Sequence, residues 1–352
     1  MSGIETRLAQ SLAARAGRGQ VEVGELAGRA MTTAGRIRTR RRVAGGAALV
    51  VLVMAAALGV RAVLPERKDT TLPVALGVPS ALSRPEGIGE DPGLLHFDLD
   101  MGKLPGDARA SIVVWSSEEE RESVAVYAAD DRLIAAVHLA PSALDLRRGL
   151  PTFDGAAVDT TVGGRPGKVG TVEVGNLMPY ADLRWEPRDG IFAAVWARDR
   201  ATAERVFDAV RLDRVQRCVT PMRLSALPAG ASWTECQTAL RVGQVPGRYV
   251  WAWSTLMIWQ GGVEWVQLWA GERGNAQFKQ DRVVAGRPAQ WLTDGMRGLW
   301  IPGFGPVSVH ILEGNPYHAD LLSEEEAVWY AERLQISEDL TNPDAWPTSA
   351  TR

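Results

Sequence analysis

The sequence contains one long apolar run, from Val43 to Val60, with no charged and no strongly polar residue. In an α-helix these eighteen residues would extend about 27 Å, close to the hydrocarbon thickness of a bilayer. Apolar residues continue to Leu64 beyond a single Arg61, whose side chain can reach the membrane interface. We therefore expect a single transmembrane helix over residues 43–64, which divides the chain into a short and a long part.

The charges on the two sides of this run predict its orientation. The N-terminal flank is strongly basic and carries Arg36, Arg38, Arg40, Arg41 and Arg42. On the C-terminal flank, between residues 61 and 69, basic and acidic side chains nearly cancel. The positive-inside rule then predicts that residues 1–42 are cytoplasmic and that the bulk of the chain is extracytoplasmic. A cleaved signal peptide is the alternative, but the long N-terminal segment and the poor cleavage site around Arg61 argue against it.

Charge is distributed unevenly along the chain. The formal net charge is −3, yet residues 1–42 carry nine Arg and three Glu, which leaves about −9 for the remainder. The acidic remainder argues against nucleic-acid binding, whereas the basic stub suits an anionic lipid leaflet or an acidic partner. Ile4, Leu8 and Leu12 form one narrow helical stripe, so the stub is either a partly disordered tether or a segment that folds on a cytoplasmic protein.

Proline and glycine mark two segments without regular structure. Residues 65–93 contain five prolines and four glycines, and we expect an extended linker between the membrane and the folded part. Residues 338–352 follow the last helical pattern and contain Pro343 and Pro347, so we expect a disordered tail.

The region between linker and tail contains an internal similarity. Three landmarks recur in the same order at offsets of 122 to 124 residues. They are Leu104-Pro105 and Leu227-Pro228, the Gly-Arg-Pro turns at 164–166 and 286–288, and the segments 209–212 and 333–336. Two copies of this length predict tandem duplicated domains, repeat 1 over 94–215 and repeat 2 over 216–337.

Each repeat has the pattern of an antiparallel sheet closed by a C-terminal helix, which is an α+β fold. In repeat 1 we expect strands at 111–115, 123–127, 133–139, 168–174, 181–185 and 191–196, then a helix at 201–210. In repeat 2 we expect strands at 248–254, 262–269, 289–292, 298–301 and 307–312. Its closing helix begins at Ser323, where Glu326 completes a capping box.

No motif of catalysis or metal binding stands out. The four histidines lack ligand spacing, and we interpret His310 and His318 as a surface pair flanking a turn. Asp98 and Asp100 fit a solvated strand edge better than a calcium site. The sequence has no nucleophile elbow and no phosphate-binding loop. We therefore expect no enzymatic activity, no cofactor and no metal.

The two cysteines, Cys218 and Cys236, both follow the expected membrane helix. An oxidising compartment makes a disulfide between them the default expectation. At the repeat offset they correspond to Leu95 and Val113. We expect the disulfide to join the first hairpin of repeat 2, and Leu95 to contact Val113 in repeat 1.

Tryptophan is concentrated late in the chain, with ten of thirteen after residue 215. Strand alternation would place Trp251 and Trp253 on one face, and Trp265 and Trp269 likewise. Such rows are either the core face of a sheet or a groove for an envelope ligand such as a glycan, peptide or lipid.

The overall layout resembles actinobacterial single-pass envelope proteins encoded with extracytoplasmic-function sigma factors. The resemblance rests on the stub that ends in Arg36–Arg42, the Ala/Val-rich anchor, the Gly-Arg-Pro hairpins and the Cys218 to Cys236 segment. It implies a sensing or regulatory role at the envelope. Zinc-type anti-sigma domains use His and Cys ligands, and residues 1–42 contain neither.

Three hypotheses follow. The first is a non-enzymatic, membrane-anchored extracytoplasmic sensor or interaction module. The second is direct regulation of a sigma factor through residues 1–42. The third is an envelope lipid or glycan carrier that uses the face of Trp251, Trp253, Trp265 and Trp269.

Overall fold

The structure is a computed structural model that describes residues 73–347 and 349, apart from 105–109, 119, 129–131, 174–178, 243–248, 261–262, 273–278, 294–296 and 314–321. All described residues belong to one compact unit, residues 53–352. The expected stub and transmembrane helix, residues 1–64, lie outside the described residues. Among the helices that are described, none has the length and apolar character needed to span a bilayer.

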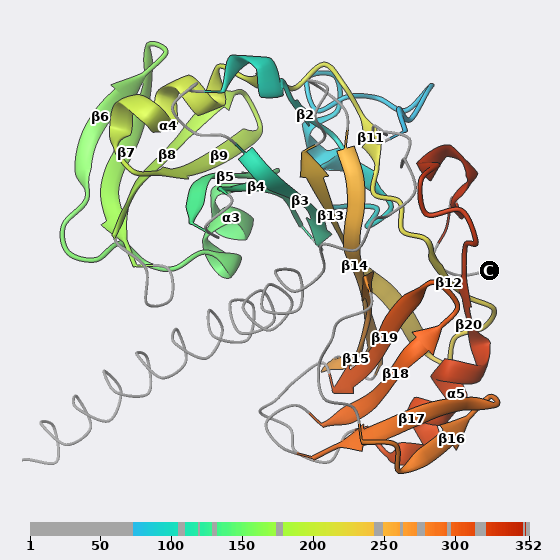
Figure 1. Ribbon diagram of the computed structural model, residues 1–352. Helices are drawn as coiled ribbons and strands as arrows, with labels where there is room; N and C mark the ends of the chain where they lie inside the picture. Colours follow the sequence, from blue (N-terminus) through green and yellow to red (C-terminus); the bar gives the residue numbers. More distant parts are fainter. Residues whose placement is uncertain are drawn as a thin grey trace, which may run out of the picture. The chain divides into compact units, whose positions relative to one another are not determined.

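A single antiparallel sheet of fourteen strands forms the framework (Figure 1). From the centre outward, its first half comprises β3 (Ala110–Glu118), β4 (Arg121–Ala128), β5 (Leu133–Ala140), β9 (Ile191–Ala197), β8 (Tyr180–Arg188), β7 (Arg165–Val172) and β6 (Val158–Val162). Its second half comprises β13 (Ala231–Val242), β14 (Tyr249–Gln260), β15 (Val263–Glu272), β19 (Val307–Glu313), β18 (Gly298–Phe304), β17 (Arg287–Leu292) and β16 (Arg282–Val284). Strands β3 and β13 pair at the centre, so the sheet continues across the expected boundary near residue 216.

The two halves have the same strand order, read from the centre to each edge. Each half also closes with a helix and a short ladder. Helix α4 (Arg200–Phe207) precedes β10 (Val210–Arg211), which pairs with β2 (Asp98–Leu99). Helix α5 (Glu324–Arg333) precedes β20 (Leu334–Ile336), which pairs with β12 (Met222–Leu224). Common descent of the halves remains a prediction.

Side-chain caps fix the starts of the helices. Asp199 accepts a hydrogen bond from the Thr202 amide at the start of α4, and Ser323 accepts one from the Glu326 amide at the start of α5. The capping box expected at Ser323 is present. A third helix, α3 (Ala143–Gly149), begins at Ser142 and was not predicted. Such caps satisfy amides that have no partner within the helix.

The main core lies on one face of the sheet, where α4 and α5 pack. A second, smaller core lies on the opposite face of the first half, beneath α3. Leu146 and Leu150, on and just after α3, pack there with Trp196 of β9. The first half is therefore covered on both faces, which explains why its central strands are apolar at nearly every position.

The expected linker and tail are both part of the fold where they are described. Within 73–93, Ala75, Ala81 and Ile88 are buried, and the Arg217 amide donates to the Pro73 carbonyl. In the tail, Trp346 is buried in the main core. Proline and glycine content correctly excluded long helices and strands here, but it does not exclude packing by the apolar residues between them.

Cys218 and Cys236 form a disulfide, with their Cα atoms 6.1 Å apart. The expected hairpin between them is wrong. Both edges of β13, which contains Cys236, are occupied by β14 and β3. Cys218 instead follows β11 (Gln216–Arg217), which pairs with β1 (Leu94–Leu95), and the bond fastens this segment to the core face of the sheet. Leu95 and Val113 are fully buried in that same core, and β1 contacts β3.

Candidate functional site

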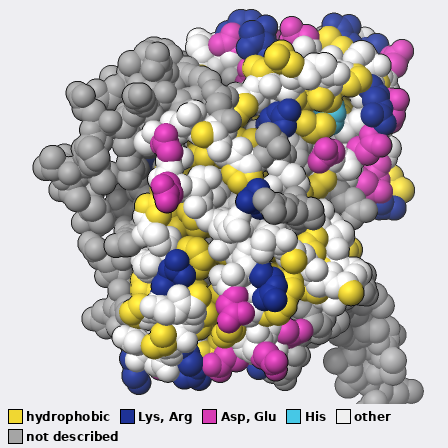
Figure 2. All heavy atoms as spheres, turned by 90° about the vertical axis from the view of Figure 1, so that its right-hand side faces the viewer, with side chains coloured by type: hydrophobic (Ala, Val, Ile, Leu, Met, Phe, Trp, Pro, Cys, Tyr) yellow, Lys and Arg dark blue, Asp and Glu magenta, His cyan; other side chains and the backbone are white. Residues whose placement is uncertain are grey.

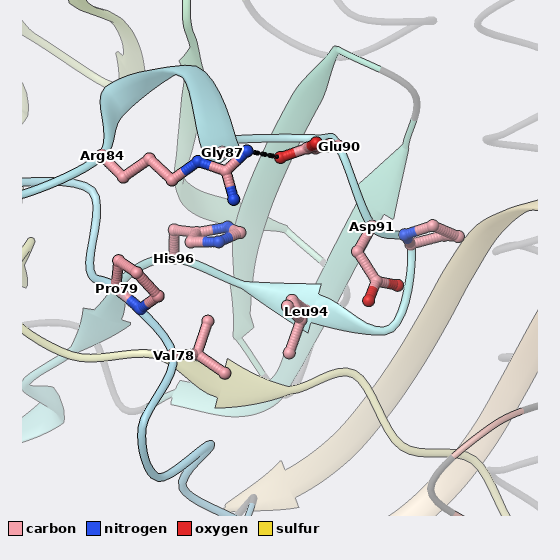
Figure 3. A pocket seen from close by; sticks show the side chains of 9 residues that line it. Val78, Pro79, Arg84, Gly87, Glu90, Asp91, Leu94 and His96 are labelled. Carbon is pink, nitrogen blue, oxygen red and sulfur yellow. Dashed lines mark hydrogen bonds and ion pairs between the residues drawn. The ribbon is translucent and has the colours of Figure 1, made fainter.

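A hollow of about 430 Å³ lies beside β1, between the segment 78–79 and the loop 84–94 (Figure 3). Its lining combines apolar and ionisable side chains. The lining residues are Val78, Pro79, Arg84, Gly87, Glu90, Asp91, Pro92, Leu94 and His96. Most of them come from the segment that the sequence predicted to be a linker.

Behind this lining lies a fully buried carboxylate, Glu122 of β4. One of its oxygens accepts from the Gly89 amide at 3.0 Å and lies 2.6 Å from Nδ1 of His96. The other accepts from the His96 amide at 2.5 Å. Burying a carboxylate without such partners would cost several kcal/mol. Three donors from one short segment therefore hold the loop 84–94 against β4.

The local backbone is shaped to allow this contact. Gly89 has a φ of +71°, and a Cβ there would lie 2.3 Å from the Arg121 amide nitrogen. Its carbonyl accepts from the Glu120 amide at 3.1 Å. Only glycine fits such a position, where the backbone is left-handed and another chain segment lies this close. Gly87 faces the His96 ring, and a Cβ at this position would lie 3.2 Å from Nε2.

The geometry orients the imidazole. A carboxylate only accepts hydrogen bonds, so the contact with Glu122 places a proton on Nδ1 of His96. Nε2 of a neutral ring is then an acceptor, and it lies next to Gly87, which also lines the hollow. Figure 3 shows the ring between the Arg84–Glu90 ion pair on one side and Pro79 and Leu94 on the other. The arrangement can accept a hydrogen bond from a molecule in the hollow.

Sequence reasoning missed this site, although one signal was present. Along β4, buried and half-buried residues alternate, and Glu122 occupies a buried position in register with Val124 and Val126. A charged residue at an inward position of an alternating strand predicts a buried polar contact. The expected strand began one residue after Glu122, so the alternation was not extended to it.

The four candidate tryptophans do not form one surface. Trp251 is 1% exposed in the main core, where its Nε1 donates to the Ser254 hydroxyl at 2.9 Å. A register shift between its partner Leu240 and the preceding Ala239 moves Trp251 to the face opposite Trp253. Trp253 and Trp269 are buried on that opposite face, around Gly271. The side chain of Trp265 lies outside the described residues.

His310 is half-buried against two tryptophans, which differs from the expected surface pair. Its ring lies 4.9 Å from that of Trp269 and 5.5 Å from that of Trp300, centroid to centroid. Loss of hydration lowers the pKa of His310 to about 4. The other member of the expected pair, His318, lies outside the described residues.

Asp98 and Asp100, predicted to lie at a solvated strand edge, both form interactions within the protein. Burial raises the pKa of Asp98, against the lowering effect of the Leu99 amide and of Arg214, which lies 3.6 Å away. Asp100 accepts from the Gly102 amide and begins a short 3-10 turn, Met101–Lys103.

Across the described residues, no group of three or more His, Cys, Asp or Glu side chains is arranged to hold a metal ion. On the face drawn in Figure 2, charged side chains of both signs are interspersed with apolar ones.

Comparisons with known proteins give weak structural similarities alone. No protein-family model matches the chain, and no characterised protein matches its sequence. One similar solved structure is MucB in complex with MucA(peri), with 12% identity, a TM-score of 0.22, and coverage of 66% of this chain and 94% of that one. Another is the Pseudomonas aeruginosa MucA/MucB complex, with 13% identity, a TM-score of 0.22, and coverage of 70% and 92%. Scores this low support no inference about function.

Proposed function

We propose that this protein is a non-enzymatic sensor or interaction module, anchored in the cytoplasmic membrane with its folded part outside the cell's reducing interior. The observation that carries the proposal is the Cys218–Cys236 disulfide. Structural disulfides persist in oxidising compartments and are rare in the cytosol. The arginine-flanked segment 43–64 supplies the membrane anchor.

The position of the disulfide indicates a structural role. Cys218 is 4% exposed and Cys236 is fully buried, and both contribute to the main core. The bond joins residues separated by 18 positions. Because it reduces the conformational entropy of the unfolded chain, it should stabilise the fold by about 3 kcal/mol. A fold that depends on such a bond fits an exported protein.

The sensing role is supported by the hollow beside His96. There a fully buried carboxylate, which already satisfies the amides of Gly89 and His96, also holds the imidazole that lines the hollow. A non-covalent binding site fits this arrangement. The placement of Trp251 on the face opposite Trp253 and Trp269 gives no support to the carrier hypothesis.

A cytoplasmic protein partner, including a sigma factor, belongs to the same proposal as its signalling output. The net charge of +6 on residues 1–42 motivates this partner. Deleting residues 2–35 leaves the arginines nearest the membrane in place and should abolish co-purification of the partner while preserving membrane insertion.

Reporter fusions test the topology. A cytoplasm-active reporter should work at residue 30 and fail at the C-terminus, and an export-dependent reporter should show the reverse. Activity of one reporter at both sites, or a mature chain that begins near Ala62, would contradict the membrane anchor.

A further inference from the structure

We propose that the hollow lined by His96 and Asp91 binds a protonated primary amine on an aliphatic chain, such as a free alkylamine or a lysine side chain. The inference rests on the proposed sensing role and names the chemical class that is sensed. It concerns the hollow itself, so it can be tested on purified protein whatever the topology.

The first step is the second ring nitrogen of His96, Nε2. The side chain is only 5% exposed, and its Nδ1 is held by Glu122 at 2.6 Å. Among the described residues, no hydrogen bond engages Nε2, although the residue lines the hollow. Nε2 is therefore an acceptor that a ligand in the hollow can engage by donating a hydrogen bond.

The second step is the balance of charge around the hollow. The guanidinium of Arg84 is held by Glu90 at 2.5 Å and lies 3.7 Å from Glu86. Asp91 accepts from the Gly93 amide through one oxygen, at 2.7 Å, and no ion pair within the described residues neutralises it. With the one lining cation engaged, Asp91 and Nε2 of His96 remain as acceptors. Both are satisfied by a donor with positive charge, and an anion would find no available cation.

The third step is the shape and polarity of the remaining lining. Val78, Pro79 and Leu94 provide apolar contact opposite the Arg84–Glu90 pair (Figure 3). A ligand with a compact cationic head and a short aliphatic body satisfies both parts of the lining. A primary ammonium carries three donors on one atom, so it can donate to Nε2 and to water while its charge is attracted by the Asp91 carboxylate at the same hollow.

The test uses nuclear magnetic resonance of histidine rings in the full chain, purified in lipid nanodiscs. The probes are n-butylammonium, Nα-acetyl-lysine N-methylamide and, as an uncharged control, n-butanol. We expect saturable shifts of the His96 ring signals with either amine and none with n-butanol. Preference for butylammonium indicates a free amine, and preference for the lysine derivative indicates a protein side chain.

Two variants sharpen the result. Asp91→Asn removes the charge but keeps a carbonyl oxygen for the Gly93 amide, so the loop should fold and affinity should fall about tenfold. Gly87→Ala places a methyl group against Nε2 and should also weaken binding. Asp159→Asn, which removes an exposed ion pair with Lys168, is the matched control and should leave binding unchanged.

Three results would overturn the proposal. They are equal shifts with n-butanol, unchanged affinity in folded Asp91→Asn, and no saturable shift with either amine. Each is separable from failure of the proposed function, because the reporter fusions do not depend on the hollow and the binding assay does not depend on membrane orientation.

Discussion

The two halves of the sheet share a strand order but stabilise it differently. Near the centre, the second half has the Cys218–Cys236 bond, whereas the first half has Leu95 and Val113, both fully buried in the same core. The first half also has the buried Glu122, which fastens the loop containing Gly89 and His96. Three kinds of contact therefore hold the segments around Cys218, Leu95 and Gly89 against one face of the sheet: a covalent bond, apolar packing and hydrogen bonds to a buried carboxylate.

The opposite face differs as well. In the first half, α3 and the residues after it cover a second core that includes Trp196. In the second half the corresponding connection, between β15 and β16, has no described helix. This face contains the buried side chains of Trp253, Trp269 and Trp300, with His310 packed against the last two. The two halves therefore share the strand order of the sheet but differ in the described elements that cover its opposite face.

The largest effect should come from the core tryptophan of the second half. Trp251→Ala removes a buried indole that packs edge-on against Trp346, with 6.3 Å between ring centroids, and donates to Ser254. We expect unfolding free energy to fall by about 3–5 kcal/mol in urea denaturation. Leu144→Ala, at a side chain 60% exposed on α3, is the control and should change little. A near-neutral Trp251→Ala would mean that this indole is not core.

Replacing the disulfide of the second half by the apolar pair of the first half tests whether the two halves pack equivalently at these positions. Cys218→Ala with Cys236→Ala should cost about 3 kcal/mol or more in the same assay. Cys218→Leu with Cys236→Val introduces the first half's pair and should recover part of this loss by refilling the core. A Leu/Val variant less stable than the Ala/Ala variant would show that the halves pack differently here.

Much of the frame was predictable from sequence because strand and turn signals are local. The segment 191–196 has continuous apolar residues after a Pro-Arg-Asp-Gly turn, and the strand observed is Ile191–Ala197. The capping box at Ser323 and Glu326 fixed the start of α5. The face of Trp251 was not predictable, since it depends on a one-residue register shift between paired strands. The hollow was not predicted because the proline and glycine content of residues 65–93 indicated an extended linker, whereas the described part of this segment packs against the sheet.

Acid should destabilise the fold through two histidines whose rings are desolvated, His310 and His138. Burial lowers the folded-state pKa of His310 to about 4, below an unfolded value of about 6.5. Between pH 6.5 and pH 4, His310 is therefore protonated in the unfolded chain but not in the folded chain. Its contribution to the free energy of unfolding is complete above pH 6.5 and is lost as the pH falls towards 4. We expect a loss of up to about 3 kcal/mol from this group, measured by denaturation at stepped pH.

His310→Phe should flatten that part of the pH profile while keeping contact with the neighbouring indoles. In the first half, desolvation lowers the pKa of His138 well below its ordinary value, with smaller contributions from Arg121 and Arg184. His138→Phe should therefore act in the same direction. An unchanged profile in the His310 variant would exclude this histidine as the source.

The Glu122 contact can be weakened without a change of shape. Glu122→Gln retains one carbonyl oxygen but sets an NH2 group against donors of Gly89 or His96. We expect a cost of about 1–3 kcal/mol by urea denaturation and increased proteolysis within residues 84–94. Glu120→Gln, at an exposed ion pair with Arg148, is the matched control. Equal stability of both variants would contradict a fastening role for Glu122.

The smallest effect should come from the edge hairpins. Between β16 and β17, Ala285 has a φ of +50°, where the corresponding turn of the first half has Gly163 at +57°. Ala285→Gly should raise stability by about 1 kcal/mol, and Gly163→Ala should lower it by about as much, since a Cβ disfavours this backbone region. Opposite shifts in melting temperature are expected, and shifts of the same sign would contradict the equivalence of the two turns.

The redox state of the native protein in living cells tests the central claim most directly. Cells are quenched in acid, denatured and alkylated before and after reduction, and the modified thiols of Cys218 and Cys236 are counted by mass spectrometry. The account predicts that neither cysteine is alkylated until the protein is reduced. Alkylation of both cysteines without reduction would contradict an extracytoplasmic, disulfide-fastened fold.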